Sequence, residues 1–302
     1  RTTLEGVPLS PTTKTIAING RPARYWEAGA ENGRTLLLIH GGVGDARINW
    51  CEVMPTLAET FRVIAPDLPG FGESAPLADV SAGAQIIWLK ALLNALEIEQ
   101  AVPIGVSFGA LLARLFASTY PEVAPAVILV NGGALPNISR GLSILSRLPL
   151  VSGVLFSAMA GSAVSRAHLE SIVTNKTAIT DELFANAQAN KPALARLMQG
   201  LISRPLPEQR VPIVPIMLLW GESDPTAPLE DAEHLCANLP GAALSPIADC
   251  GQMPQLEVGE VFAFQVIHFL ERLSRPSHLP AGPLPTKTAG TRPSDFEQTK
   301  PL

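Results

Sequence analysis

The chain has 302 residues, of which 47% are hydrophobic and 16% are charged, and its formal net charge at pH 7 is −5. This length is enough to bury the core of a large α/β domain, and the low charged fraction indicates an apolar globular protein. Because the balance is slightly acidic and no basic run is present, we expect no nucleic acid partner.

The three cysteines, Cys51, Cys236 and Cys250, are widely spaced and odd in number, so they predict neither a disulfide framework nor a zinc site. We expect no metal and no cofactor. The printed N-terminus lacks the apolar run of a signal peptide, and a reducing, cytoplasmic location fits best. The uncharged run over residues 148–165 contains Pro, Gly and Ser, which favours a buried or interfacial helix over a membrane span. Oligomeric state is not predicted.

Strand and helix patterns alternate along most of the chain. Two short strands are predicted at residues 13–18 and 23–28, and six apolar strands at 35–40, 62–67, 101–106, 126–131, 214–220 and 242–248. Helices with apolar residues at three-to-four spacing are predicted at 83–97, 108–119, 229–238 and 256–273. Continuous apolar strands are typical of a parallel sheet covered on both faces, so the pattern predicts a doubly wound α/β fold.

The alternation is interrupted once. Residues 134–209 show helical patterns and no convincing strand, which predicts a helical cap over the carboxyl edge of the sheet, where α/β proteins bind ligands. The core is then expected to comprise residues 1–133 and 210–275. Residues 276–302 are rich in Pro, Thr and Ser, and we expect a disordered tail.

The motif GVSFG over residues 105–109 lies between a predicted strand and a predicted helix. Small residues on both sides of Ser107 permit a sharp, strained turn that lifts the hydroxyl into a site, so Ser107 is the candidate nucleophile. His40 is followed by two glycines at the end of another strand. The backbone N–H groups of Gly42 and Phe108 are therefore candidates for an oxyanion hole, whereas His40 is expected to be a buried structural histidine.

Four motifs appear together in a family's order: HGGVGDARINW, VIAPDLPGFGES, GVSFGA and MLLWGESDPTAP. On these motifs, over residues 13–273, the chain resembles the α/β-hydrolase superfamily, and within it small esterases and carbon–carbon bond hydrolases. The resemblance implies a mostly parallel eight-stranded sheet, a cap between strands six and seven, and a triad in the order nucleophile, acid, histidine. Asp224 matches the position of the acid.

The family's histidine position is occupied by Gln252, within GQMPQLE, although the flanking Gly, Pro and Glu are present. A glutamine amide forms hydrogen bonds but does not accept a proton from a serine near neutral pH, so ordinary hydrolysis should be severely impaired. His168, in the predicted cap, is a weak candidate for a replacement base. His268 is too far along the last helix.

Three functions stay open. The leading one is a serine hydrolase acting on a small apolar ester or related carbonyl compound. The alternatives are a non-catalytic protein that binds an apolar ligand, and a lyase or cyclase on the same fold. Gln252 itself has three alternative origins: an engineered inactivation, a natural loss of activity, or chemistry that needs no imidazole base.

Overall fold

The computed structural model describes residues 10–134, 149–203, 206 and 211–274. The predicted tail and the first part of the predicted cap lie outside these residues. The strands are β1 (Thr12–Ile18), β2 (Arg21–Ala28), β3 (Thr35–Ile39), β4 (Arg62–Pro66), β5 (Ala101–Val106), β6 (Val127–Val130), β7 (Ile216–Gly221) and β8 (Ala242–Ile247). All of the predicted strands are present, and no strand end differs from its predicted position by more than two residues.

These strands form one eight-stranded sheet in the order β1-β2-β4-β3-β5-β6-β7-β8. Strand β2 pairs antiparallel with β1 and with β4, and the pairs from β4 to β8 are parallel. The predicted mostly parallel α/β fold is therefore confirmed.

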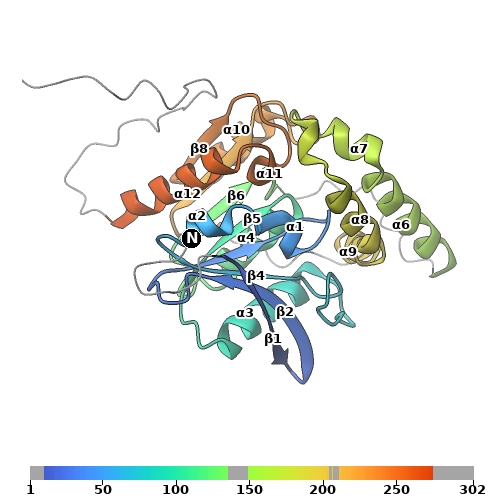
Figure 1. Ribbon diagram of the computed structural model, residues 1–302, viewed down its shortest axis with the longest axis horizontal. Coiled ribbons are helices and arrows are strands. Elements are labelled where there is room, and N and C mark those ends of the chain that lie inside the picture. Colours follow the sequence, from blue (N-terminus) through green and yellow to red (C-terminus); the bar gives the residue numbers. More distant parts are fainter. Residues whose placement is uncertain (1–9, 135–148, 204–205, 207–210, 275–302) are drawn as a thin grey trace, which may run out of the picture.

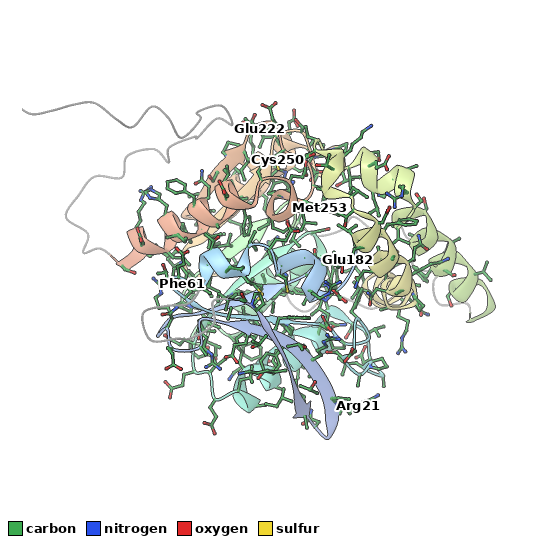
Figure 2. All side chains as sticks on the ribbon, in the orientation of Figure 1. Arg21, Phe61, Glu182, Glu222, Cys250 and Met253 are labelled. Atoms are coloured by element: carbon green, nitrogen blue, oxygen red, sulfur yellow. The ribbon has the colours of Figure 1, made fainter. Side chains whose placement is uncertain are left out.

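Helices cover both faces of the sheet (Figure 1). They are α1 (Ala46–Trp50), α2 (Met54–Leu57), α3 (Ala82–Ala95), α4 (Phe108–Thr119), α10 (Leu229–Ala237), α11 (Pro254–Glu257) and α12 (Gly259–Ser274). Successive residues of β3 alternate between two apolar cores: Leu37 packs with residues of α3 and α4, and Leu38 packs with residues of α2 and α12. Side chains fill the space between these layers (Figure 2). Burial on both faces explains why the strands are continuous apolar runs.

Between β6 and β7 the described residues form α6 (Pro149–Ala163), α7 (Arg166–Ser171), the 3-10 helix η1 (Lys176–Ala178), α8 (Asp181–Ala189) and α9 (Lys191–Ser203). We call residues 149–203 the α6–α9 segment; its helices lie together at one side of the sheet (yellow-green to olive in Figure 1). In the part of the chain that the structure describes, no helix combines the length and the apolar character that a bilayer span requires.

Two features of the helices differ from the predictions. The short helices α1 and α2 were not predicted, because five and four residues are too few to show a helical period. The predicted helix over residues 256–273 is interrupted at Val258, whose φ of −143° and ψ of 50° are not helical. The chain therefore turns once between α11 and α12.

Candidate active site

Ser107 occupies the sharp turn between β5 and α4. Its φ of 55° and ψ of −116° lie in a region that non-glycine residues rarely adopt. The turn depends on close backbone approach: a Cβ atom on Gly109 would lie 2.1 Å from the carbonyl oxygen of Ile39, and one on Gly132 would lie 2.4 Å from that of Ser107. Packing thus requires glycine at the last position of the GVSFG motif, and also at Gly132, just after β6.

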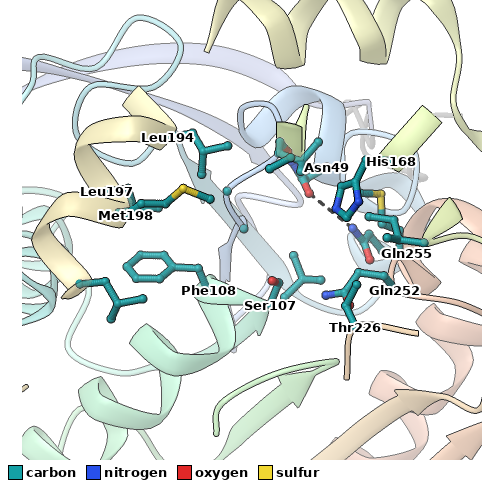
Figure 3. A pocket seen from close by; sticks show the side chains of 18 residues that line it. Asn49, Ser107, Phe108, His168, Leu194, Leu197, Met198, Thr226, Gln252 and Gln255 are labelled. Carbon is teal, nitrogen blue, oxygen red and sulfur yellow. Dashed lines mark hydrogen bonds between the residues drawn. The ribbon is translucent and has the colours of Figure 1, made fainter. Parts of the chain in front are cut away.

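A cavity of about 290 Å³ lies above this turn, and Ser107, Gly42, Phe108 and Gln252 all line it. Figure 3 shows Leu194, Leu197 and Met198 of α9 on one wall, with His168, Asn49, Gln255, Gln252 and Thr226 on the other side. None of the described lining residues is Asp, Glu, Lys or Arg. The structure therefore brings four of the predicted site residues to one largely apolar cavity.

Asp224 lies beneath this cavity wall, buried and connected to Gln252 through Thr226. One carboxylate oxygen of Asp224 accepts hydrogen bonds from the N–H and the hydroxyl of Thr226, both at 2.8 Å, and from the N–H of Ala227 at 3.1 Å. The other accepts a hydrogen bond from the Asn131 amide at 2.6 Å. The Thr226 hydroxyl also contacts the Gln252 carbonyl oxygen. Because a hydroxyl carries one hydrogen, Thr226 can donate to Asp224 or to Gln252 at any moment, but not to both.

Asn131 and Thr226 were missed in the sequence analysis. Asn131 follows β6 with a φ of 43°, donates to Asp224, and accepts the N–H of Gly221 at 3.1 Å. The side-chain amide nitrogen of Gln252 donates to the backbone carbonyl of Asn131 at 3.3 Å. The usable signal was position: a polar residue directly after a buried parallel strand lies at the same sheet edge as the other site residues.

The connection between β8 and α11, which carries Gln252, is held by the buried carboxylate of Glu257. This carboxylate accepts hydrogen bonds from the N–H groups of Gly251 at 3.1 Å and Met253 at 3.1 Å. It also accepts the N–H groups of residues 174 and 175 in the α6–α9 segment, at 2.7 Å and 3.1 Å. Figure 2 shows Met253 on this connection. One side chain thus fixes the Gln252 loop and the neighbouring segment together.

The histidines occupy different environments. His40 is fully buried; its Nδ1 lies 2.7 Å from the Gly41 carbonyl oxygen, and its Nε2 accepts the N–H of Leu68 at 2.9 Å. Burial lowers the pKa of His40 to about 4, so its ring is neutral at physiological pH. His168 lines the cavity from α7, on the same side as Gln252 and Gln255 (Figure 3). His268 stacks on Phe264 within α12 and does not line the cavity.

Comparison with known proteins agrees with this architecture. Residues 34–154 match the family model described as alpha/beta hydrolase fold. An uncharacterised protein of Mycobacterium tuberculosis is 30% identical over 269 residues, which cover 81% of this chain and 76% of that protein. A 2-hydroxy-6-oxo-6-phenylhexa-2,4-dienoate hydrolase of Burkholderia cepacia is 29% identical over 286 residues, covering 86% of this chain and 97% of that enzyme.

A solved structure of a putative lipase from Acinetobacter baumannii AYE superposes with a TM-score of 0.74 at 25% identity, covering 88% of this chain and 93% of the other. The shared sheet order, the strand–serine–helix turn and these relatives lead to one conclusion: the chain belongs to the α/β-hydrolase family.

Proposed function

We propose that the protein is a serine-type hydrolase scaffold for a small, neutral, apolar ester or related carbonyl compound, in which Ser107 is the nucleophile. The observation that supports this most directly is the strained Ser107 turn, which directs the residue into the apolar cavity. The N–H groups of Gly42 and Phe108, which line the same cavity, would stabilise the oxyanion that forms when the hydroxyl attacks the carbonyl.

The α6–α9 segment is proposed to act as a cap, within a cap domain over residues 134–209 and a core over residues 1–133 and 210–275. It supplies His168 and the leucines of α9 to the cavity. A substrate would thus lie between the Ser107 turn and an apolar lid, where water is excluded and the charge on the oxyanion is stabilised more strongly.

The cavity wall favours a neutral substrate. The relative from Burkholderia cepacia is named for a dienoate, which carries a carboxylate. Among the described residues that line the cavity here, no Lys or Arg is present to pair with a carboxylate. Burying an unpaired charge in such a wall is costly, whereas an uncharged ester loses little on transfer.

Gln252 is proposed to limit the chemistry. Attack by Ser107 requires a group that takes the hydroxyl proton and later returns it to the leaving group. A glutamine amide cannot do so, and loss of the base in a serine triad costs on the order of 10⁶ in turnover, with the residual rate supplied by the oxyanion hole and binding. The protein with Gln252 is thus expected to hydrolyse esters very slowly.

One observation favours a second function, a non-catalytic protein that binds an apolar ligand. Both ends of the Gln252 amide are engaged, the nitrogen with the Asn131 carbonyl and the oxygen with the Thr226 hydroxyl. The Gln252 amide therefore belongs to the polar network beneath the cavity without supplying a base, and the cavity could hold a ligand with no reaction.

The test compares the unmodified protein and the Gln252→His variant. The control is Ser107→Ala in the Gln252→His background. Each is assayed with short and medium acyl p-nitrophenyl esters and with a fluorophosphonate probe. We expect Gln252→His to raise kcat/KM by several orders of magnitude, and Ser107→Ala to abolish both the gain and the labelling. No gain and no labelling at Ser107 would contradict the hydrolase proposal.

The same assay separates the remaining functions. Tight binding of an apolar ester without turnover in either form would favour the binding protein. A product that forms only while Gln252 is retained would instead indicate a lyase or cyclase.

A further inference from the structure

A second cavity, of about 150 Å³, lies on the other side of α9, next to the loop that follows β4. Four of its lining residues are buried and form its floor: Pro69, Gln85, Ala193 and Leu197. Pro76 and Arg196 are exposed and form its rim. The cavity therefore opens at the surface and extends inward to Gln85 and Leu197.

Leu197 lines both cavities, and its exposed fraction is 4%. Leu194, Leu197 and Leu201 follow each other at three-to-four spacing on α9 and line the main cavity (Figure 3 for the first two). Arg196, about 100° around the helix from Leu197, lines only the second cavity. Leu197 thus stands at the border of two helix faces, and its side chain forms part of the partition between the two cavities.

The backbone around this partition is held in place. A Cβ atom on Gly200 would lie 2.2 Å from the carbonyl oxygen of Val80, so α9 packs directly on the backbone of that loop. The Arg196 guanidinium also donates to the carbonyl of Leu77 at 2.8 Å. Opening the partition therefore calls for rotation of the Leu197 side chain rather than a shift of α9.

The floor of the second cavity contains a polar group that lacks a partner. The Gln85 side chain is 1% exposed, and its Oε1 atom has no hydrogen-bond partner among the described residues. Buried carbonyl oxygens are almost always hydrogen-bonded, and leaving one without a donor is costly. This oxygen is itself fully buried, so an O–H or N–H group that enters the cavity would supply the missing donor once the Gln85 amide turns toward it.

We propose that the second cavity is the distal part of the substrate site and accepts the hydroxyl end of an ω-hydroxyacyl chain when the Leu197 side chain turns aside. The chain would extend from Ser107 along the leucines of α9, past Leu197, and its terminal hydroxyl would donate to Gln85. This subsite rests on the proposed function, since that function places the acyl group at Ser107.

The kinetic test uses the Gln252→His background and p-nitrophenyl esters of butanoic, decanoic and ω-hydroxydecanoic acid. Leu197→Ala removes the partition. Leu194→Ala is the matched control, because Leu194 is on the same helix, is also 4% exposed, and lines only the main cavity. We expect Leu197→Ala to raise kcat/KM for the ω-hydroxydecanoate relative to the butanoate by about tenfold or more.

Adding Gln85→Met to Leu197→Ala should remove the preference for the ω-hydroxydecanoate over the decanoate while the longer chain is still accepted. Equal effects of Leu197→Ala and Leu194→Ala would overturn the role of the partition. A hydroxyl preference that survives Gln85→Met, or that never appears because water satisfies Gln85, would overturn the assignment of the subsite.

Calorimetry separates failure of the subsite from failure of the proposed function, since binding needs no turnover. The unmodified protein, its Leu197→Ala variant and the Leu197→Ala/Gln85→Met double variant are titrated with decanamide and ω-hydroxydecanamide. We expect Leu197→Ala to bind the ω-hydroxydecanamide more tightly than the decanamide, and the double variant to bind the two amides equally. Absence of this difference refutes the subsite, even when the Gln252→His enzyme is fully active; its presence supports the subsite even when that enzyme is inactive.

Discussion

Replacing Glu257 by glutamine tests how the loop carrying Gln252 is held. One carboxylate oxygen accepts the N–H groups of Gly251 and Met253, and the other accepts those of residues 174 and 175, as well as Gly251 at longer range. A glutamine retains one acceptor oxygen, but its amide nitrogen is a donor. Turned one way, the amide nitrogen leaves the N–H groups of residues 174 and 175 without an acceptor. Turned the other way, it leaves that of Met253 without one, while Gly251 keeps an acceptor at 3.2 Å.

The expected loss follows from these contacts. A hydrogen bond to a charged group contributes about 1.5–3 kcal/mol, and each buried donor left unpaired costs about 1–3 kcal/mol. With one or two such donors, and with some relaxation of the loop, we expect Glu257→Gln to lower the free energy of unfolding by about 2–4 kcal/mol. Urea unfolding measures this, and hydrogen exchange should become faster at residues 172–175 and 251–253 together.

The matched control is Glu260→Gln, the same substitution three residues further on at an exposed position in the first turn of α12. There we expect a loss of no more than about 1 kcal/mol, because only the interaction with the helix dipole changes. If Glu257→Gln and Glu260→Gln destabilise the protein equally, or if exchange increases on only one side of Glu257, the carboxylate does not join the two segments and the reasoning is wrong.

Two further predictions concern stability. Gly132→Ala should lower the free energy of unfolding by roughly 1–3 kcal/mol, seen as a lower thermal midpoint, because its Cβ would lie 2.4 Å from the Ser107 carbonyl oxygen. Gly33→Ala is the control and should change the midpoint little, because nothing lies within 4 Å of its Cβ. The second concerns pH: burial lowers the pKa of His40 to about 4 and raises the pKa of Asp67 to about 6. As pH falls from about 6.5 to 4, His40 lowers the free energy of unfolding by about 3 kcal/mol, because only the unfolded chain gains a proton at this residue. Over nearly the same range Asp67 raises the free energy of unfolding by about 3 kcal/mol, because the folded chain binds a proton at this residue first. The two effects largely cancel, so Asp67→Asn should make urea midpoints fall more steeply over this range than in the parent, and an unchanged slope would refute the assignment.

Local patterns predicted the regular elements well, and the reason is physical. Strands of a covered parallel sheet are apolar on both faces, so β3 and β5 stand out as continuous apolar runs. The break at Val258 was not visible, because nothing in the sequence around it forbids a helix. At this point α11 and Glu257 contact distant segments, Gln255 through Asn49 and Glu257 through the N–H groups of residues 174 and 175.

The sequence by itself determined the fold class and the order of the motifs, and it led to the expectation that Gln252 occupies the position of the family's histidine, since these depend on residue type and near neighbours. Only the tertiary structure decided that Thr226 and Asn131 lie between Asp224 and Gln252. The physical reason is the pairing of β6 with β7, which brings Asn131 to hydrogen-bond distance of Gly221, ninety residues away in the chain. Contacts across such a separation depend on strand register, and no local pattern of residues records it.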